Sequence, residues 1–328
     1  MKSGFSIENR QFLPYNEEQS RKPGSVFPEA GRVGTVVKKG PLCVLACYVI
    51  WGMLPIYWRL FSAVNSLYIL AARIVWSLVL MGIVLLIGKR REAVLSVLKD
   101  KRELRRLVLA GIAVCVNWGS YIWAVNGGHG VDASLAYYMN PILTIFLATM
   151  VFREKLTKLQ WLSVAVTFTG LVAAVIRYRQ IPWAALIIGG SFAVYGAIKK
   201  GVKSPADVSL FFETLVLAPA ALVLMLVMEV QGSGALSVLS GVRLMLLPTV
   251  GAVTTIPLLY YAKGIRETPM SLAGILMYIN PTLQLLISVV LFHEAFTTTH
   301  AILFVFVWSG LALYLAAAGR EKRKEKIR

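Results

Sequence analysis

The sequence predicts an all-α membrane protein in which ten transmembrane helices form two inverted five-helix repeats. Its 328 residues are 57% hydrophobic and only 15% charged, whereas soluble domains carry about 25% charged residues. Apolar runs of about twenty residues, the length that crosses a bilayer as a helix, recur along the chain. A pattern from the first half also returns 140 positions later. Together these features exclude an ordinary soluble domain.

The apolar runs divide the chain into equal halves. They cover approximately residues 41–61, 66–88, 107–126, 132–152, 159–177, 182–199, 207–228, 243–262, 270–292 and 299–319. Each half holds five runs, so the second half enters the membrane in the opposite orientation, and a pseudo-twofold axis in the membrane plane is expected. The predicted parts are a polar tail that is disordered and cytoplasmic or an extension from a misplaced start, two five-helix repeats, and a basic cytoplasmic tail: residues 1–40, 41–180, 181–319 and 320–328.

The repeat is clearest in the segment from Val131 to Lys155, an apolar run with an Asn-Pro pair in its middle. Three features align at an offset of 140: Asn140-Pro141 with Asn280-Pro281, Glu154 with Glu294, and Gly170 with Gly310. Proline donates no backbone hydrogen bond, so Pro141 and Pro281 are predicted to break the fourth and ninth helices. The carbonyl groups that they free need partners other than lipid.

The basic residues indicate which side each connection faces. The net charge of +18 resembles that of a nucleic-acid-binding protein. With the N-terminus inside, however, twenty-two Lys and Arg residues fall in cytoplasmic connections and only four, Arg59, Arg177, Arg179 and Arg243, in external ones. This bias predicts that both termini are cytoplasmic, and it explains the charge without nucleic acid. The basic C-terminal tail is expected to contact anionic lipid headgroups.

Two ionisable residues fall within apolar runs, Arg73 in the second and Glu213 in the seventh. They are 140 positions apart, at equivalent places in the two repeats. A charge that faces lipid costs about 2.5–3.5 kcal/mol, so both are expected to face inward. One hypothesis places them in a shared aqueous cavity, where they pair or bind opposite ends of a zwitterionic or polar substrate. The alternative is that Arg73 extends to the headgroups and Glu213 caps a backbone group.

Other polar residues inside the runs are candidates for the same cavity. They are Asn117, Tyr121, Asn140, Tyr278 and Asn280. Asn117 and Tyr121 are one helical turn apart, so they share a face. Aromatic residues near mid-span suit an amphipathic aromatic solute or a cation, although plain packing explains them equally well.

No pattern in the sequence indicates catalysis. There is no GxxxxGK[ST] phosphate loop and no GxSxG elbow, and His293-Glu294 is followed by Thr297 where a metalloprotease has its second His. The three cysteines lie in apolar runs without zinc-binding spacing, which favours packing. We therefore predict no enzymatic activity, no metal and no cofactor. Glu213 is the only carboxylate of the runs that is placed to carry a proton.

Several blocks of sequence resemble the RarD subgroup of EamA-type carriers, in the drug/metabolite transporter superfamily. They are YVIWGMLPIYWR (48–59), ARIVWS (72–77), NWGSYIWAVN (117–126), DASLAYYMNPILTIFLATMVFREKL (132–156), YGAIKK (195–200) and VTTIPLLYYA (253–262). The resemblance spans residues 41–319. It implies a ten-helix permease of the bacterial inner membrane. Two positions depart from the subgroup's pattern: Ala72 stands where a His is usual, and Asn280 where many members have Gly.

The expected function is secondary transport of a small metabolite or an amphipathic drug, outward and by alternating access. The expected partners are this substrate and membrane lipid. The sequence is also compatible with a homodimer. The alternative function is a membrane sensor or scaffold that binds a solute without moving it.

Overall fold

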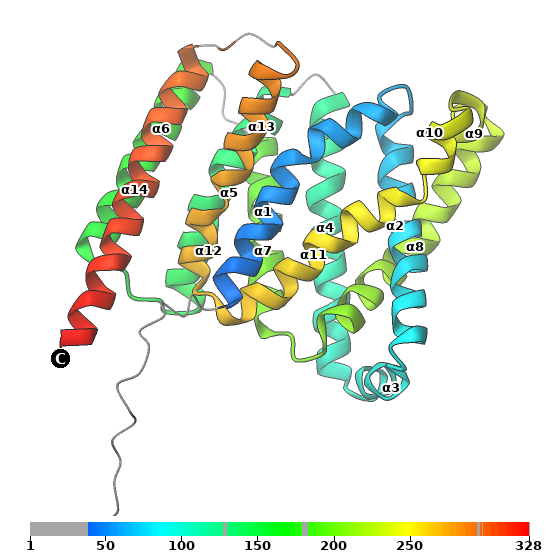
Figure 1. Ribbon diagram of the computed structural model, residues 1–328, viewed down its shortest axis with the longest axis horizontal. Helices are drawn as coiled ribbons and strands as arrows, with labels where there is room; N and C mark the ends of the chain where they lie inside the picture. The colour runs from blue at the N-terminus through cyan, green and yellow to red at the C-terminus, as the bar shows by residue number, and fades with distance from the viewer. Residues whose placement is uncertain (1–38, 127–129, 179–182, 294–295, 297, 328) are drawn as a thin grey trace, which may run out of the picture. The chain divides into compact units, whose positions relative to one another are not determined.

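The computed structural model describes residues 39–126, 130–178, 183–293, 296 and 298–327, and every element among them is a helix (Figure 1). The elements of the first half are α1 (Lys39–Trp58), the 3₁₀ helix η2 (Arg59–Phe61), α2 (Ser66–Ile87), α3 (Arg91–Lys99), α4 (Lys101–Asn126), α5 (Gly130–Val151) and α6 (Lys158–Tyr178). Those of the second half are α7 (Trp183–Gly201), α8 (Ala206–Val230), α9 (Ala235–Val238), α10 (Gly241–Leu246), α11 (Thr249–Glu267), α12 (Met270–Leu276), α13 (Ile279–Val290) and α14 (Thr298–Ile327). The predicted N-terminal tail lies outside the described residues, apart from its last two positions.

The apolar runs of the sequence form the long helices. Eight helical segments of the described chain are long and apolar enough to cross a membrane. The fourth predicted run is a shorter apolar helix over Leu135–Val151, and the sixth coincides with α7, which has 19 residues. The chain is therefore an all-helical, multi-pass membrane protein.

Helices from the two halves of the chain pack side by side. The main pairs are α6 with α14, α5 with α7, α2 with α8, α4 with α7, α1 with α11, α2 with α11, α1 with α13, and α12 with α5. In Figure 1, α3 lies at one end of the helices, and α9 and α10 lie at the other. The cavity described below lies between these ends.

The pair formed by α6 and α14 stands at one edge of the helical bundle (Figure 1). Glycine lets the two backbones approach: Gly170 faces the side chain of Phe306, and Gly310 faces Thr167. The Ser163 hydroxyl donates a hydrogen bond to the Gly310 carbonyl at 2.6 Å. Lipid tails are as apolar as the helix surfaces, so the hydrophobic effect does not drive helices together inside a membrane. Close packing at small residues and short polar contacts of this kind hold them together instead.

The two Asn-Pro pairs have different effects on their helices. In the region of the ninth predicted helix, the turn residues Met277 and Tyr278 separate α12 from α13, and Pro281 follows three residues later inside α13. The prediction for the fourth helix is wrong, because α5 continues through Pro141. The Tyr278 hydroxyl donates a hydrogen bond to the Tyr138 carbonyl at 3.2 Å, one turn before Pro141. The carbonyl that loses its helical donor is that of Tyr137, four residues before Pro141, so this hydrogen bond links the other half of the chain to the same turn without replacing the missing bond.

Glu154, in the connection between α5 and α6, caps the first turn of α12. Its carboxylate accepts hydrogen bonds from the backbone nitrogens of Met270 at 2.7 Å and Ser271 at 3.0 Å. It also accepts one from the Ser271 hydroxyl at 2.7 Å. A negative charge at a helix N-terminus is favoured by the helix dipole and by the unpaired N–H groups there. Glu154 therefore ties the two halves together; Glu294, its equivalent in the repeat, lies outside the described residues.

Replacing Glu154 with Gln should lower the free energy of unfolding by about 1–3 kcal/mol, because the neutral amide keeps only one oxygen to accept the three hydrogen bonds. Thermal unfolding of the purified protein in detergent measures the loss. Glu92→Gln, at an exposed position in the first turn of α3, is the control: it also neutralises a charge near a helix N-terminus but breaks none of the described hydrogen bonds, so its loss of stability should be clearly smaller. Equal stability of E154Q and E92Q would contradict the capping role.

Candidate functional site

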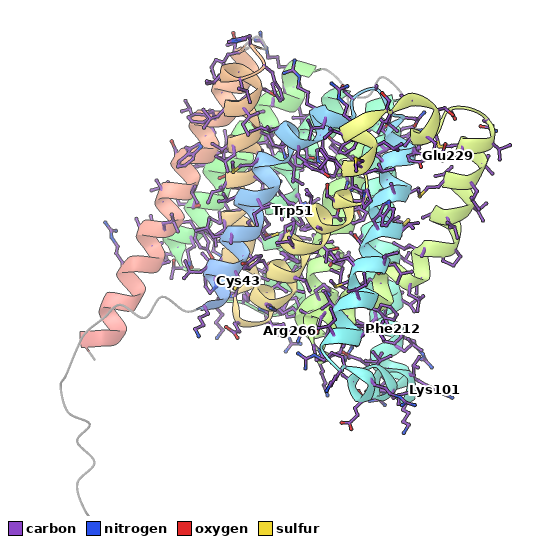
Figure 2. All side chains as sticks on the ribbon, turned by 45° about the vertical axis from the view of Figure 1, so that its right-hand side comes forward. Cys43, Trp51, Lys101, Phe212, Glu229 and Arg266 are labelled. Carbon is purple, nitrogen blue, oxygen red and sulfur yellow. The ribbon has the colours of Figure 1, made fainter. Side chains whose placement is uncertain are left out.

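A cavity of about 640 Å³ opens among the helices of both halves. It is lined by Trp51, Leu54, Pro55, Trp58, Arg59, Arg73, Asn117, Trp118, Tyr121, Tyr137, Asn140, Phe192, Met277, Asn280, Gln284 and Phe292. Figure 2 shows Trp51 between the ends of the bundle, with Lys101 at one end and Glu229 at the other. The size is typical of a site for a small organic molecule.

Five of the seven candidate residues from the sequence meet at this cavity: Arg73, Asn117, Tyr121, Asn140 and Asn280. They come from four helices, α2, α4, α5 and α13. Glu213 and Tyr278 lie outside it. Tyr278 is buried, and its hydroxyl donates a hydrogen bond to the Tyr138 carbonyl of α5 instead of facing the cavity.

Asn140 and Asn280 both line the cavity, and a glycine of a neighbouring helix packs closely against the backbone of each. Gly189 of α7 packs on the backbone of Asn140, and Gly52 of α1 packs on the carbonyl of Asn280. Within their own helices, the Asn140 side-chain oxygen accepts from the Thr144 hydroxyl at 3.2 Å, and that of Asn280 accepts from the Gln284 amide at 2.8 Å. The glycines therefore let α7 and α1 approach the backbones of α5 and α13 closely at the level of the two Asn residues.

Arg73 is held at the cavity by neutral groups alone. Its Nε donates a hydrogen bond to the Thr254 hydroxyl of α11 at 3.0 Å. Its guanidinium carbon lies 4.5 Å from the ring centre of Trp118 and 5.0 Å from that of Trp58. Among the described residues no carboxylate forms an ion pair with it. Two cation–π contacts and one hydrogen bond to a neutral hydroxyl therefore stabilise the positive charge of Arg73.

The hypothesis that Arg73 and Glu213 share one cavity is wrong. The buried carboxylate of Glu213 pairs with the buried ammonium of Lys199 at 2.6 Å. The Ser209 hydroxyl donates to the same carboxylate at 2.7 Å and the Tyr195 hydroxyl at 3.1 Å. A charge inside a membrane protein needs a partner, and Glu213 finds it on α7 instead of α2.

An aromatic layer lies between the cavity and this buried ion pair. Trp51 and Phe192 line the cavity and contact each other edge to face, with ring centres 5.5 Å apart. Behind them lies Tyr195, which binds Glu213. Its ring stacks on that of Tyr261, with ring centres 5.9 Å apart and 15° between the ring planes. The ion pair thus forms a second polar centre that is separate from the cavity.

Several lining residues were not among the candidates from the sequence. Gln284 lies one turn beyond Asn280, and its position inside an apolar run was a signal that could have identified it. Arg59 and Phe292 lie at the outer ends of their runs, where the sequence pattern predicts solvent contact. The Arg59 guanidinium packs over the Phe292 ring at 4.3 Å.

The part of the chain that the structure describes contains no group of three His, Cys, Asp or Glu side chains that could hold a metal ion. His293 is exposed, and Glu294 and Thr297 lie outside the described residues. The cavity itself offers cations, amides and aromatic rings.

The chain is similar to a family of transporters, to individual bacterial proteins and to a solved structure. Residues 38–176 match the EamA-like transporter family. The chain is 37% identical to an uncharacterized transporter, YojE, of Bacillus subtilis, over 88% of this chain and 97% of that one. It is 35% identical to a protein RarD of Streptomyces exfoliatus, over 89% and 92% of the two chains. A crystal structure with 19% identity superposes with a TM-score of 0.64, over 85% of this chain and 98% of that one.

Proposed function

The chain belongs to the EamA-like transporter family, in its RarD branch, and from this premise we propose a specific transport activity. The protein is a secondary transporter that moves a small metabolite or an amphipathic drug outward across the bacterial inner membrane by alternating access. The observation that carries the proposal is the cavity of about 640 Å³, walled by Asn140 of one half and Asn280 of the other. A site between two halves becomes accessible from opposite sides when the halves move against each other.

The packing of the helices supports an arrangement of ten spans in two inverted repeats. An offset of 140 residues relates α4 to α11, α7 to α1, and α5 to α12 and α13. The same exchange converts the contact of α4 with α7 into that of α11 with α1, and the contact of α5 with α7 into that of α13 with α1. The pairs α2 with α8 and α6 with α14 are converted into themselves. Such a contact pattern is what a pseudo-twofold axis between the halves produces.

The distribution of charge supports the proposed orientation. Lys101 and Arg266 lie toward one end of the bundle and Glu229 toward the other (Figure 2). Helix α3, at the same end as Lys101, begins at Arg91 and follows the connection that carries Lys89 and Arg90. Basic connections face the cytoplasm, so this end, together with both termini, is proposed to be cytoplasmic.

Flux measurements on the reconstituted protein test the proposal. A compound is first selected because it raises the melting temperature of the purified protein, as any ligand of the folded state does. Its labelled form should then exchange across proteoliposomes, saturably and faster than across empty liposomes. Asn140→Leu and Asn280→Leu should each reduce the flux about three- to tenfold, the equivalent of one neutral hydrogen bond.

The control for these variants is Gln231→Leu, an exposed polar residue beyond the end of α8, which should leave the flux unchanged. A compound that stabilises the protein and yet never crosses the bilayer would contradict transport, and would favour a membrane sensor or scaffold.

A further inference from the structure

The charge of the cavity wall defines the kind of molecule that it accepts. We propose, on the premise of the transport function above, that the cargo is a small organic anion whose carboxylate binds Arg73. Its remaining part is a planar aromatic or apolar body that lies against the indole and phenol rings of the cavity.

All the ionisable charge on the described cavity wall is positive. Arg73 and Arg59 are its charged residues, and no Asp or Glu is among the described lining residues. Glu213, the carboxylate that was expected to share the cavity with Arg73, instead forms an ion pair with Lys199 behind the aromatic layer. A site with two guanidinium groups and no counter-charge attracts an anion and repels a cation.

Arg73 has donors left for a ligand. Its Nε is bound to the Thr254 hydroxyl, which in turn donates to the Val250 carbonyl at 2.8 Å, so this edge of the guanidinium is fixed. The two terminal nitrogens have no hydrogen-bond partner among the described residues. Paired terminal N–H groups of arginine match the two oxygens of a carboxylate, and such charged hydrogen bonds are about twice as strong as neutral ones. A bound carboxylate would supply the counter-charge that Arg73 lacks.

Three of the aromatic rings that line the cavity already contact an arginine guanidinium. The rings of Trp58 and Trp118 form cation–π contacts with the guanidinium of Arg73, and the ring of Phe292 forms one with that of Arg59. The remaining aromatic lining consists of two edge-to-face pairs: Tyr121 with Tyr137, with ring centres 5.7 Å apart, and Trp51 with Phe192, with ring centres 5.5 Å apart. Such rings bind planar apolar groups by stacking and edge contacts.

The experiment compares ligands that share one body and differ in charge. Binding to the purified protein is measured by calorimetry for benzoate, phenylacetate, 3-phenylpropionate and indole-3-acetate, for the matching amides, and for the matching amines. We expect at least one carboxylate to bind about tenfold to a hundredfold more tightly than its amide, because a charged hydrogen bond is worth about 1.5–3 kcal/mol. The amines should bind more weakly than the amides.

Variants of Arg73 assign the preference to its charge. Arg73→Gln should abolish the difference between carboxylate and amide, whereas Arg73→Lys should retain part of it. Arg243→Gln, an exposed arginine of α10 outside the cavity, should retain all of it. The proposal is overturned if no carboxylate of the series binds, if an amide or amine binds as tightly as its carboxylate, or if R73Q keeps the preference.

Flux of the same compounds separates this inference from the transport function. Carboxylate binding that depends on Arg73 without any flux would keep the anion site and remove transport. Flux of the amides or amines without carboxylate binding would remove the anion site and keep transport.

Discussion

Replacing Lys199 with Met is expected to lower the free energy of unfolding by about 3–5 kcal/mol, the usual cost of leaving one member of a buried ion pair alone. The Lys199 ammonium and the Glu213 carboxylate are both buried and lie 2.6 Å apart. Without Lys199, the carboxylate keeps only the hydroxyl groups of Ser209 and Tyr195. Thermal unfolding in detergent should therefore show a large decrease in melting temperature for K199M.

A second substitution distinguishes loss of the charge balance from loss of packing. In the double variant Lys199→Met, Glu213→Gln, the amide at position 213 is neutral and can still bind Tyr195 and Ser209. We expect this variant to recover most of the lost stability, because replacing both charges of a buried pair is often neutral. Lys263→Met, an exposed lysine of α11, is the matched control. A double variant that is no more stable than K199M would show that the ion pair is not the cause.

Replacing Gly251 with Ala is expected to destabilise the protein by about 1–3 kcal/mol, the usual cost of overpacking a well-packed interior. A Cβ atom at Gly251 would lie 2.6 Å from the Trp76 carbonyl oxygen and 2.7 Å from the Trp76 Cβ. These atoms belong to the backbone of α2 and its first side-chain atom, so they cannot move away unless α2 and α11 separate. Melting temperature measures the loss.

The same substitution should also weaken binding at the cavity. Thr254, which fixes the Nε of Arg73, lies one turn beyond Gly251 on α11. Displacing α11 would move this hydroxyl away from the guanidinium. Gly82→Ala is the control on α2, because no atom lies within 4 Å of a Cβ at that position, and both its stability and its ligand binding should match the parent. A G251A variant indistinguishable from G82A would contradict the close contact of the two helices.

The long helices could be predicted from hydropathy because a bilayer requires an apolar run of fixed length in each helix that crosses it. The path of the chain at Pro141 could not. Proline often interrupts a helix, yet α5 continues through Pro141 just as α1, α8 and α11 continue through Pro55, Pro219 and Pro257. A proline inside an apolar run therefore does not by itself determine whether the helix is interrupted, because neighbouring helices can pack around the disturbed turn.

Part of the cavity could be predicted for a similar reason. Arg73 and Asn117 are costly in lipid, so their positions in apolar runs indicated an interior location, and both line the cavity. The partner of Glu213 was missed because Lys199 precedes Lys200 and Lys203 at the end of a run, where the pattern of basic residues indicates a solvated connection. Lys199 is instead fully buried. Only the placement of its side chain against α8 reveals this.

The edge position of α6 and α14 offers a practical site for spectroscopic reporters. Neither helix contributes a described residue to the cavity wall, and the exposed side chains of Trp161, Phe168 and Val305 point away from the core. A fluorophore attached at one of these positions would sense its lipid surroundings without obstructing ligand entry.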